Sequence, residues 1–167
     1  MKKQQAQLTE KKLAGITCRT SNAIISASDP ANNPIALTVQ QYLTRNIPEA
    51  LAERIAPGTT YGVYTHYESD VNGEYTYFIG EEVASFSAVP EGVETLVIPA
   101  QTYAKFTNHP GPMPAVCIDM WTKIWKQTST ALGGERAYIA DFEVYDERSR
   151  AQDNAVLDIY IGITRAP

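Results

Sequence analysis

The sequence predicts an α+β domain in which one βαββ unit occurs twice. The order strand, helix, strand, strand runs through residues 11–86 and begins again in residues 93–165. The segment YFIG at residues 77–80 also matches IYIG at residues 159–162. Two such units predict an antiparallel sheet of about eight strands, two main helices packed against it, pseudo-twofold symmetry and a central groove for a ligand. A chance coincidence of short strand patterns is the alternative.

The first unit begins with a strand at residues 11–21, where apolar residues alternate, followed by a loop rich in Asn, Pro and Ser at residues 22–34. Apolar residues spaced four apart then predict a helix through residues 35–55. Because proline cannot continue a helical hydrogen-bond ladder, Pro48 predicts a kink or a restart in this helix. Two further strands are predicted at residues 60–68 and 73–86, joined by a turn.

The second unit is predicted from the same signals. An extended segment, a loop and a helix that ends at paired glycines come first, and two strands follow. In order, these elements span residues 93–108, 109–114, 115–134, 135–147 and 155–166.

The composition describes a single domain of 167 residues with a formal net charge of −5. Basic residues gather only at Lys2, Lys3, Lys11 and Lys12. We expect this cluster to mark a solvated N-terminal arm (residues 1–10) and the start of the strand beside it, rather than a nucleic-acid-binding face. No apolar run is long enough to span a bilayer, and the N-terminus lacks an apolar signal region. We therefore expect a cytoplasmic protein that contacts neither nucleic acid nor a membrane directly.

No metal, cofactor or catalytic residue is expected. Cys18 and Cys117 lack the spacing of a zinc or redox motif, so they are predicted to be small buried apolar residues. Neither His66 nor His109 has a second ligand at metal-binding spacing. The chain also lacks a nucleophile elbow and a phosphate-binding glycine loop.

The segment DFEVY at residues 141–145 is a strand with two acids on one face. Because side chains alternate along a strand, Asp141, Glu143 and Tyr145 share that face. Aligning the two units places Glu143 at the position of Thr65, so the acid is an addition to the repeat. It faces either solvent or a pocket, since a charge buried without a partner is expensive.

Aromatic residues favour the pocket. Trp121 and Trp125 are spaced i and i+4 in the second helix, so they share one face, either as core anchors or as the wall of a cleft. Tyr160 occupies the position of Phe78 in the repeat. Flat ring faces around one acid suit a cationic aromatic molecule.

The chain resembles the GyrI-like effector-binding domain, the small-molecule sensor of AraC-type and MerR-type transcription regulators. The resemblance runs from about residue 11 to 165 and rests on the order of six segments: YGVYTHYES, GEYTYFIGEEV, LVIPAQTYAKF, MWTKIW, ADFEVYDE and LDIYIGI. It implies a duplicated βαββ fold whose groove binds varied small molecules, often lipophilic cations. The recurring glutamate of such domains corresponds to Glu143, and aromatic residues near it correspond to Trp121 and Tyr160. Since only about ten residues precede the first predicted strand, we expect a stand-alone sensor without a helix-turn-helix.

We therefore predict that the chain binds a small, lipophilic, cationic aromatic molecule, with Asp141 at the polar rim of the groove. Two alternatives stay open. One is a hydrolase of reactive electrophiles in which Glu143 activates water, and the other is a module that binds a protein partner such as a regulator or gyrase. The predicted ligand-binding residues are Glu143, Trp121, Tyr160, Tyr103, Phe78, Tyr61 and Trp125.

Overall fold

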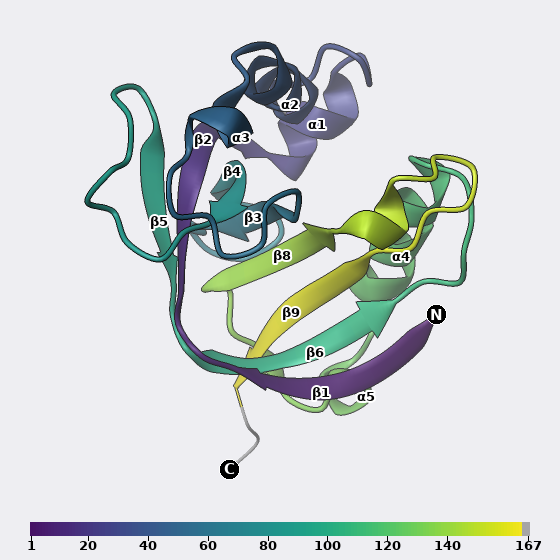
Figure 1. The fold of residues 1–167 in the computed structure, drawn as a ribbon. Coiled ribbons are helices and arrows are strands. Elements are labelled where there is room, and N and C mark those ends of the chain that lie inside the picture. The colour runs from purple at the N-terminus through teal and green to yellow at the C-terminus, as the bar shows by residue number, and fades with distance from the viewer. Residues whose placement is uncertain (165–167) are drawn as a thin grey trace.

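The computed structural model describes residues 1–164 and has the predicted α+β architecture (Figure 1). The helices are α1 (Asn22–Ala27), α2 (Pro34–Thr44), α3 (Ile47–Ala50), α4 (Ala115–Trp125) and α5 (Ser129–Leu132). The strands are β1 (Lys2–Leu8), β2 (Lys11–Ser21), β3 (Thr60–Thr65), β4 (Glu74–Glu82), β5 (Glu94–Ile98), β6 (Gln101–Thr107), β7 (Glu135–Arg136), β8 (Ala140–Tyr145) and β9 (Asp158–Thr164).

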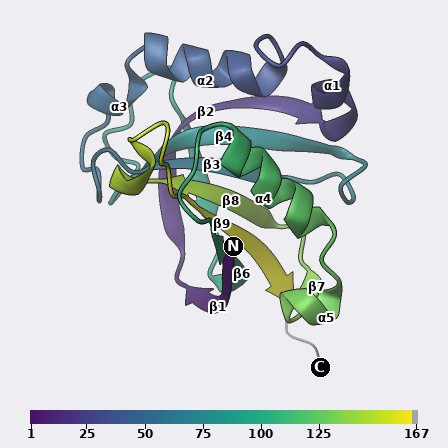
Figure 2. The ribbon, with the colours of Figure 1, turned by 90° about the vertical axis from the view of Figure 1, so that its right-hand side faces the viewer.

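All nine of these strands join one open antiparallel sheet. Its order is β1-β6-β9-β8-β3-β4-β2-β5, and β7 pairs with β9 beside this path. The predicted duplication is visible in the order, because β3 and β8 pair at the middle while β4 and β2 on one side correspond to β9 and β6 on the other. Helices α2 and α4 lie over the two halves on the same side of the sheet (Figure 2).

The pairing of β3 with β8 corrects the alignment of the two units. Gly62 lies opposite Glu143, and Tyr64 lies opposite Asp141. Residues that face each other across antiparallel strands project to the same side, so Gly62 and Tyr64 share the face of the two acids. Thr65 projects to the other face, and the alignment of Glu143 with Thr65 was therefore wrong by one residue.

Three segments differ from the predictions, because strand pairing and helix capping decided their structure and composition did not. Residues 2–8, expected to be a solvated arm, form strand β1 along β6, although most of their side chains are exposed. Part of the expected loop after β2 is helix α1, where the Ser21 side chain accepts a hydrogen bond from the backbone N–H of Ile24 at 3.2 Å. The extended segment 93–108 is two strands, since β5 pairs with β2 whereas β6 pairs with β1 and β9.

The predicted helices are also shorter than their apolar patterns. The break between α2 and α3 comes at Asn46, which has a positive φ of 51°, so the helix ends before Pro48. Pro48 then lies in the first turn of α3, where its missing N–H is tolerated. The helix predicted at residues 115–134 ends at Trp125 as α4. Thr128 then caps the N-terminus of the separate helix α5. The end of the last predicted strand, residues 165–166, lies outside the described residues.

None of the helices within residues 1–164 combines the length and the apolar character needed to cross a membrane.

Candidate functional site

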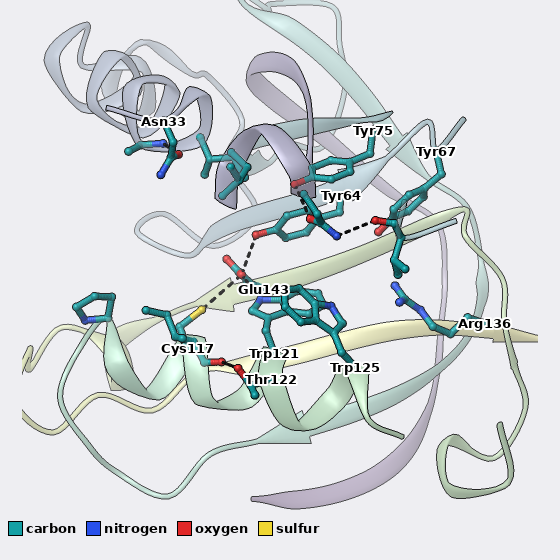
Figure 3. A pocket seen from close by; sticks show the side chains of 17 residues that line it. Asn33, Tyr64, Tyr67, Tyr75, Cys117, Trp121, Thr122, Trp125, Arg136 and Glu143 are labelled. Atoms are coloured by element: carbon teal, nitrogen blue, oxygen red, sulfur yellow. Dashed lines mark hydrogen bonds between the residues drawn. The ribbon is translucent and has the colours of Figure 1, made fainter. Parts of the chain in front are cut away.

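A cavity of about 380 Å³ lies between the sheet and the helices α1, α2 and α4 (Figure 3). The floor comes from β3, β4 and β8, and α4 supplies one wall. This volume falls in the range of small-molecule sites. Its aromatic lining consists of Tyr64, Tyr67, Tyr75, Trp121 and Trp125. We call this space the aromatic cavity.

Glu143 lies at the floor of the aromatic cavity and is only 4% exposed. Its Oε1 accepts hydrogen bonds from Trp121 Nε1 at 2.6 Å, from the Tyr64 hydroxyl at 3.2 Å and from the Cys117 thiol at 3.5 Å. Its Oε2 accepts one from the Tyr145 hydroxyl at 2.6 Å. All four hydrogen bonds are donated to Glu143, so both of its oxygens act as acceptors.

No cation balances this carboxylate within residues 1–164. None of the ion pairs in this part of the chain includes Glu143. Arg136 also lines the cavity, but its guanidinium pairs with Asp141. A buried carboxylate held by neutral donors keeps its negative charge available to a ligand.

Asp141 has a different environment, and the prediction that it lies at a polar rim was wrong. It is fully buried, pairs with Arg136, and accepts hydrogen bonds from the Tyr67 hydroxyl at 2.7 Å and from the Gly162 N–H at 2.8 Å. These contacts tie β8 to β7, to β9 and to Tyr67 in the connection that follows β3. Asp141 is therefore part of the framework beneath the cavity.

The donors around Glu143 are held in their protonated forms. Burial, and secondly the negative charge of Glu143, raises the pKa of the Tyr64 hydroxyl well above its ordinary range. The same two causes raise the pKa values of the Cys117 thiol and the Tyr145 hydroxyl. Burial is also the main reason that the pKa of Tyr75 rises to about 12. The phenols and the thiol therefore remain donors at neutral pH.

Gly62 makes room for the carboxylate. A Cβ atom at Gly62 would lie 3.0 Å from Glu143 Oε2 and 3.1 Å from the hydroxyl oxygen of Tyr77. Both distances are shorter than ordinary van der Waals contacts, so a larger residue would push Glu143 from its position. The close approach across the β3–β8 pair explains why this strand position has no side chain.

Two tryptophans of α4 reach the cavity as their spacing predicts. Trp121 packs edge-on against Tyr64, with ring centroids 5.1 Å apart, while Trp125 is 56% exposed. Cys117 precedes Trp121 by one turn on the same helical face. Figure 3 shows these three side chains pointing from α4 toward Glu143 and the sheet.

The structure brings Glu143, Trp121 and Trp125 together but places the other predicted residues elsewhere. Tyr160 stacks on Phe142, with ring centroids 4.7 Å apart, on the opposite face of the sheet from Glu143. Tyr160 and Phe142 belong to a hydrophobic cluster on this opposite face. The same cluster contains three further predicted residues: Tyr61, Phe78 and Tyr103.

Sequence reasoning missed Tyr64, Tyr67 and Tyr75, which line the aromatic cavity. Period-two alternation carries the signal for Tyr64, which would have been found if β3 and β8 had been aligned by face.

No group of three potential metal ligands was found within residues 1–164.

Comparison with known proteins gives the family. The model of the family described as "Cass2: Integron-associated effector binding protein" matches residues 6–163. The chain belongs to this family. The resemblance to GyrI-like effector-binding domains is thus confirmed for family and fold.

Three relatives of this Cass2-family chain illustrate the match. YobU of Bacillus subtilis, named as a transcriptional regulator, is 28% identical over 155 residues, which are 93% of each chain. An integron cassette protein from the mobile metagenome of Vibrio cholerae has the same fold, with a TM-score of 0.76 and 23% identity over 97% of this chain and 95% of its own. The protein SAV2435, solved with bound tetraphenylphosphonium, has a TM-score of 0.76 and 13% identity over 98% of this chain and 94% of its own.

Proposed function

We propose that this protein binds lipophilic organic cations with aromatic faces in the aromatic cavity, with Glu143 as their counter-charge. One observation carries the proposal: a buried carboxylate accepts four hydrogen bonds from neutral donors but has no cationic partner within residues 1–164. A buried charge that lacks an opposite charge attracts one from the ligand. The cavity beside it is open to such a molecule.

The aromatic walls suit the same ligand. The ring faces of Trp121, Trp125 and Tyr64 attract a cation that displaces water from the cavity. The tetraphenylphosphonium found in SAV2435 is a lipophilic aromatic cation, which supports this choice of ligand class. Because the carboxylate is buried, its attraction for a cation is screened less than that of a surface acid.

Replacing Glu143 tests the counter-charge. Glu143→Gln keeps the shape of the side chain but removes its charge, so we expect tetraphenylphosphonium to bind about 1–3 kcal/mol more weakly. Isothermal titration calorimetry, supported by quenching of tryptophan fluorescence, measures this loss. Asp119→Asn is the matched control, because it removes one carboxylate from the exposed side of α4, where Asp119 pairs with Lys123. Equal affinity in wild type and Glu143→Gln contradicts the proposal.

We further propose that the bound cation is a signal for transcription. The name of YobU as a transcriptional regulator supports this output. The cavity provides the coupling, since a molecule held in it contacts both Trp121 on α4 and Tyr64 on the sheet. Comparing transcript levels in a host with wild-type protein and with Glu143→Gln, each with and without tetraphenylphosphonium, tests the output. A response that is the same in both contradicts it.

A further inference from the structure

A second hollow adjoins the aromatic cavity and has different chemistry. It measures about 480 Å³ and lies between the β3–β4 connection, the end of α4, α5 and β7. Four residues line both spaces: Asn22, Val71, Trp125 and Arg136. Polar side chains found only in the second space are Asn72, Gln127, Ser129 and Glu135. We call it the polar chamber.

Arg136 marks the junction of the two spaces. Its Nη2 pairs with Asp141, and the guanidinium lies over the Tyr138 ring at 4.5 Å. Its other terminal nitrogen, Nη1, makes no hydrogen bond within residues 1–164 and is not among the buried unpaired atoms of that range. Figure 3 shows the side chain pointing from β7 toward the cavity. Arg136 can therefore donate to an acceptor on a ligand without giving up Asp141.

The remaining polar groups of the chamber differ in how free they are. Asn22 is engaged on both sides, since its amide donates to Val71 and accepts from Tyr75. Glu135 is exposed and accepts from Ser129. Asn72 is exposed as well, and its side chain makes no hydrogen bond in the described part of the chain. The donors at Arg136 Nη1 and at the exposed Asn72 amide are thus unengaged in the described part of the chain, whereas the Glu135 carboxylate already accepts from Ser129.

We infer that the polar chamber is a second subsite, which takes a neutral, hydrogen-bond-accepting tail of the cation held in the aromatic cavity. The inference rests on the proposed function. An ether, hydroxyl or carbonyl oxygen accepts from Arg136 and Asn72, whereas a second positive charge meets the Arg136 guanidinium at the junction. The preferred ligand class is an elongated amphiphile with one aromatic cationic head and one polar uncharged tail.

Three triphenylphosphonium compounds with tails of equal length test the subsite. The tails are n-octyl, the ethyl ether of diethylene glycol, and 7-aminoheptyl. The measured quantity is the affinity of the ether compound divided by that of the octyl compound, which removes the contribution of the shared head. We expect Asn72→Ala and Arg136→Lys each to lower this ratio about 3- to 10-fold, the value of one hydrogen bond.

Thr122→Ala is the matched control, because Thr122 lines only the aromatic cavity, and it should leave the ratio unchanged. Arg136→Lys keeps a positive charge near Asp141. If Arg136→Lys does not fold, Asn72→Ala alone tests the subsite. An unchanged ratio in Asn72→Ala and in any folded Arg136→Lys overturns the subsite. A gain for the aminoheptyl tail that is lost in Glu135→Gln overturns the choice of a neutral tail. If the octyl compound does not bind the wild type at all, the proposed function fails as well.

Discussion

Asp141 and Glu143 are two buried carboxylates on one face of the same strand, yet their surroundings differ. Asp141 has a cation, Arg136, in addition to its hydrogen bonds. Within residues 1–164, Glu143 is surrounded by neutral donors only. Burial alone therefore does not mark a functional acid. What separates the two is whether the protein supplies the opposite charge itself or leaves it to a ligand.

The largest expected effect is a difference in the free energy of unfolding between variants of the two acids. Asp141→Asn leaves the Arg136 guanidinium without its partner, so we expect the free energy of unfolding to fall by about 3–5 kcal/mol. Glu143→Gln strands no cation but replaces one acceptor oxygen by an amide NH2 group among hydrogen-bond donors, so we expect a smaller loss of about 1–2 kcal/mol. Urea unfolding of both variants measures the difference. Equal losses would contradict the division into a structural and a ligand-facing acid.

A smaller effect is expected from crowding Glu143. Gly62→Ala brings a Cβ to within 3.0 Å of Glu143 Oε2, so we expect a loss of about 1–3 kcal/mol in the free energy of unfolding and weaker binding of tetraphenylphosphonium. The shorter side chain in Glu143→Asp should relieve the crowding. A double-mutant cycle measures the coupling, and strictly additive losses would show that Gly62 does not position the carboxylate.

The third prediction concerns alkaline pH. The pKa of the Cys117 thiol is raised from an ordinary value of 9.0, so above pH 9 the unfolded chain releases a proton that the folded chain keeps. Stability is therefore fully present below pH 9 and is lost as the pH rises, by about 1.4 kcal/mol per pH unit for one group. Cys117→Ser should show a shallower decline above pH 9 in chemical unfolding. Parallel curves for the two proteins would contradict the assignment.

The sequence predicted the elements of this site better than their faces. Glu143, Trp121 and Trp125 were found because strand alternation and i, i+4 spacing are local. Tyr160 and the other aromatics of its cluster were assigned to the groove in error, because alternation alone does not say which face of a strand meets the helices. That information lies in the pairing of β3 with β8, which no local pattern contains.

The fold shows the same limit. The duplicated order of strands and helices could be predicted from the sequence, since each unit repeats its hydrophobic pattern, and the strand order of the sheet agrees with it. Strand β1 was missed because its side chains are mostly polar and exposed, and it forms by pairing with β6, a segment distant in the sequence. Helix α1 was missed because the Asn and Ser residues of its segment predicted a loop, although Ser21 caps the helix.

The central claim is that the aromatic cavity selects positive charge through Glu143. Tetraphenylphosphonium and tetraphenylborate have nearly the same shape and opposite charges, so calorimetric titration of both isolates the sign of the charge. We predict that the wild-type protein binds the phosphonium and discriminates against the borate, and that Glu143→Gln loses most of this preference. Equal binding of the two ions by the wild type, or a preference that survives in Glu143→Gln, would contradict the account.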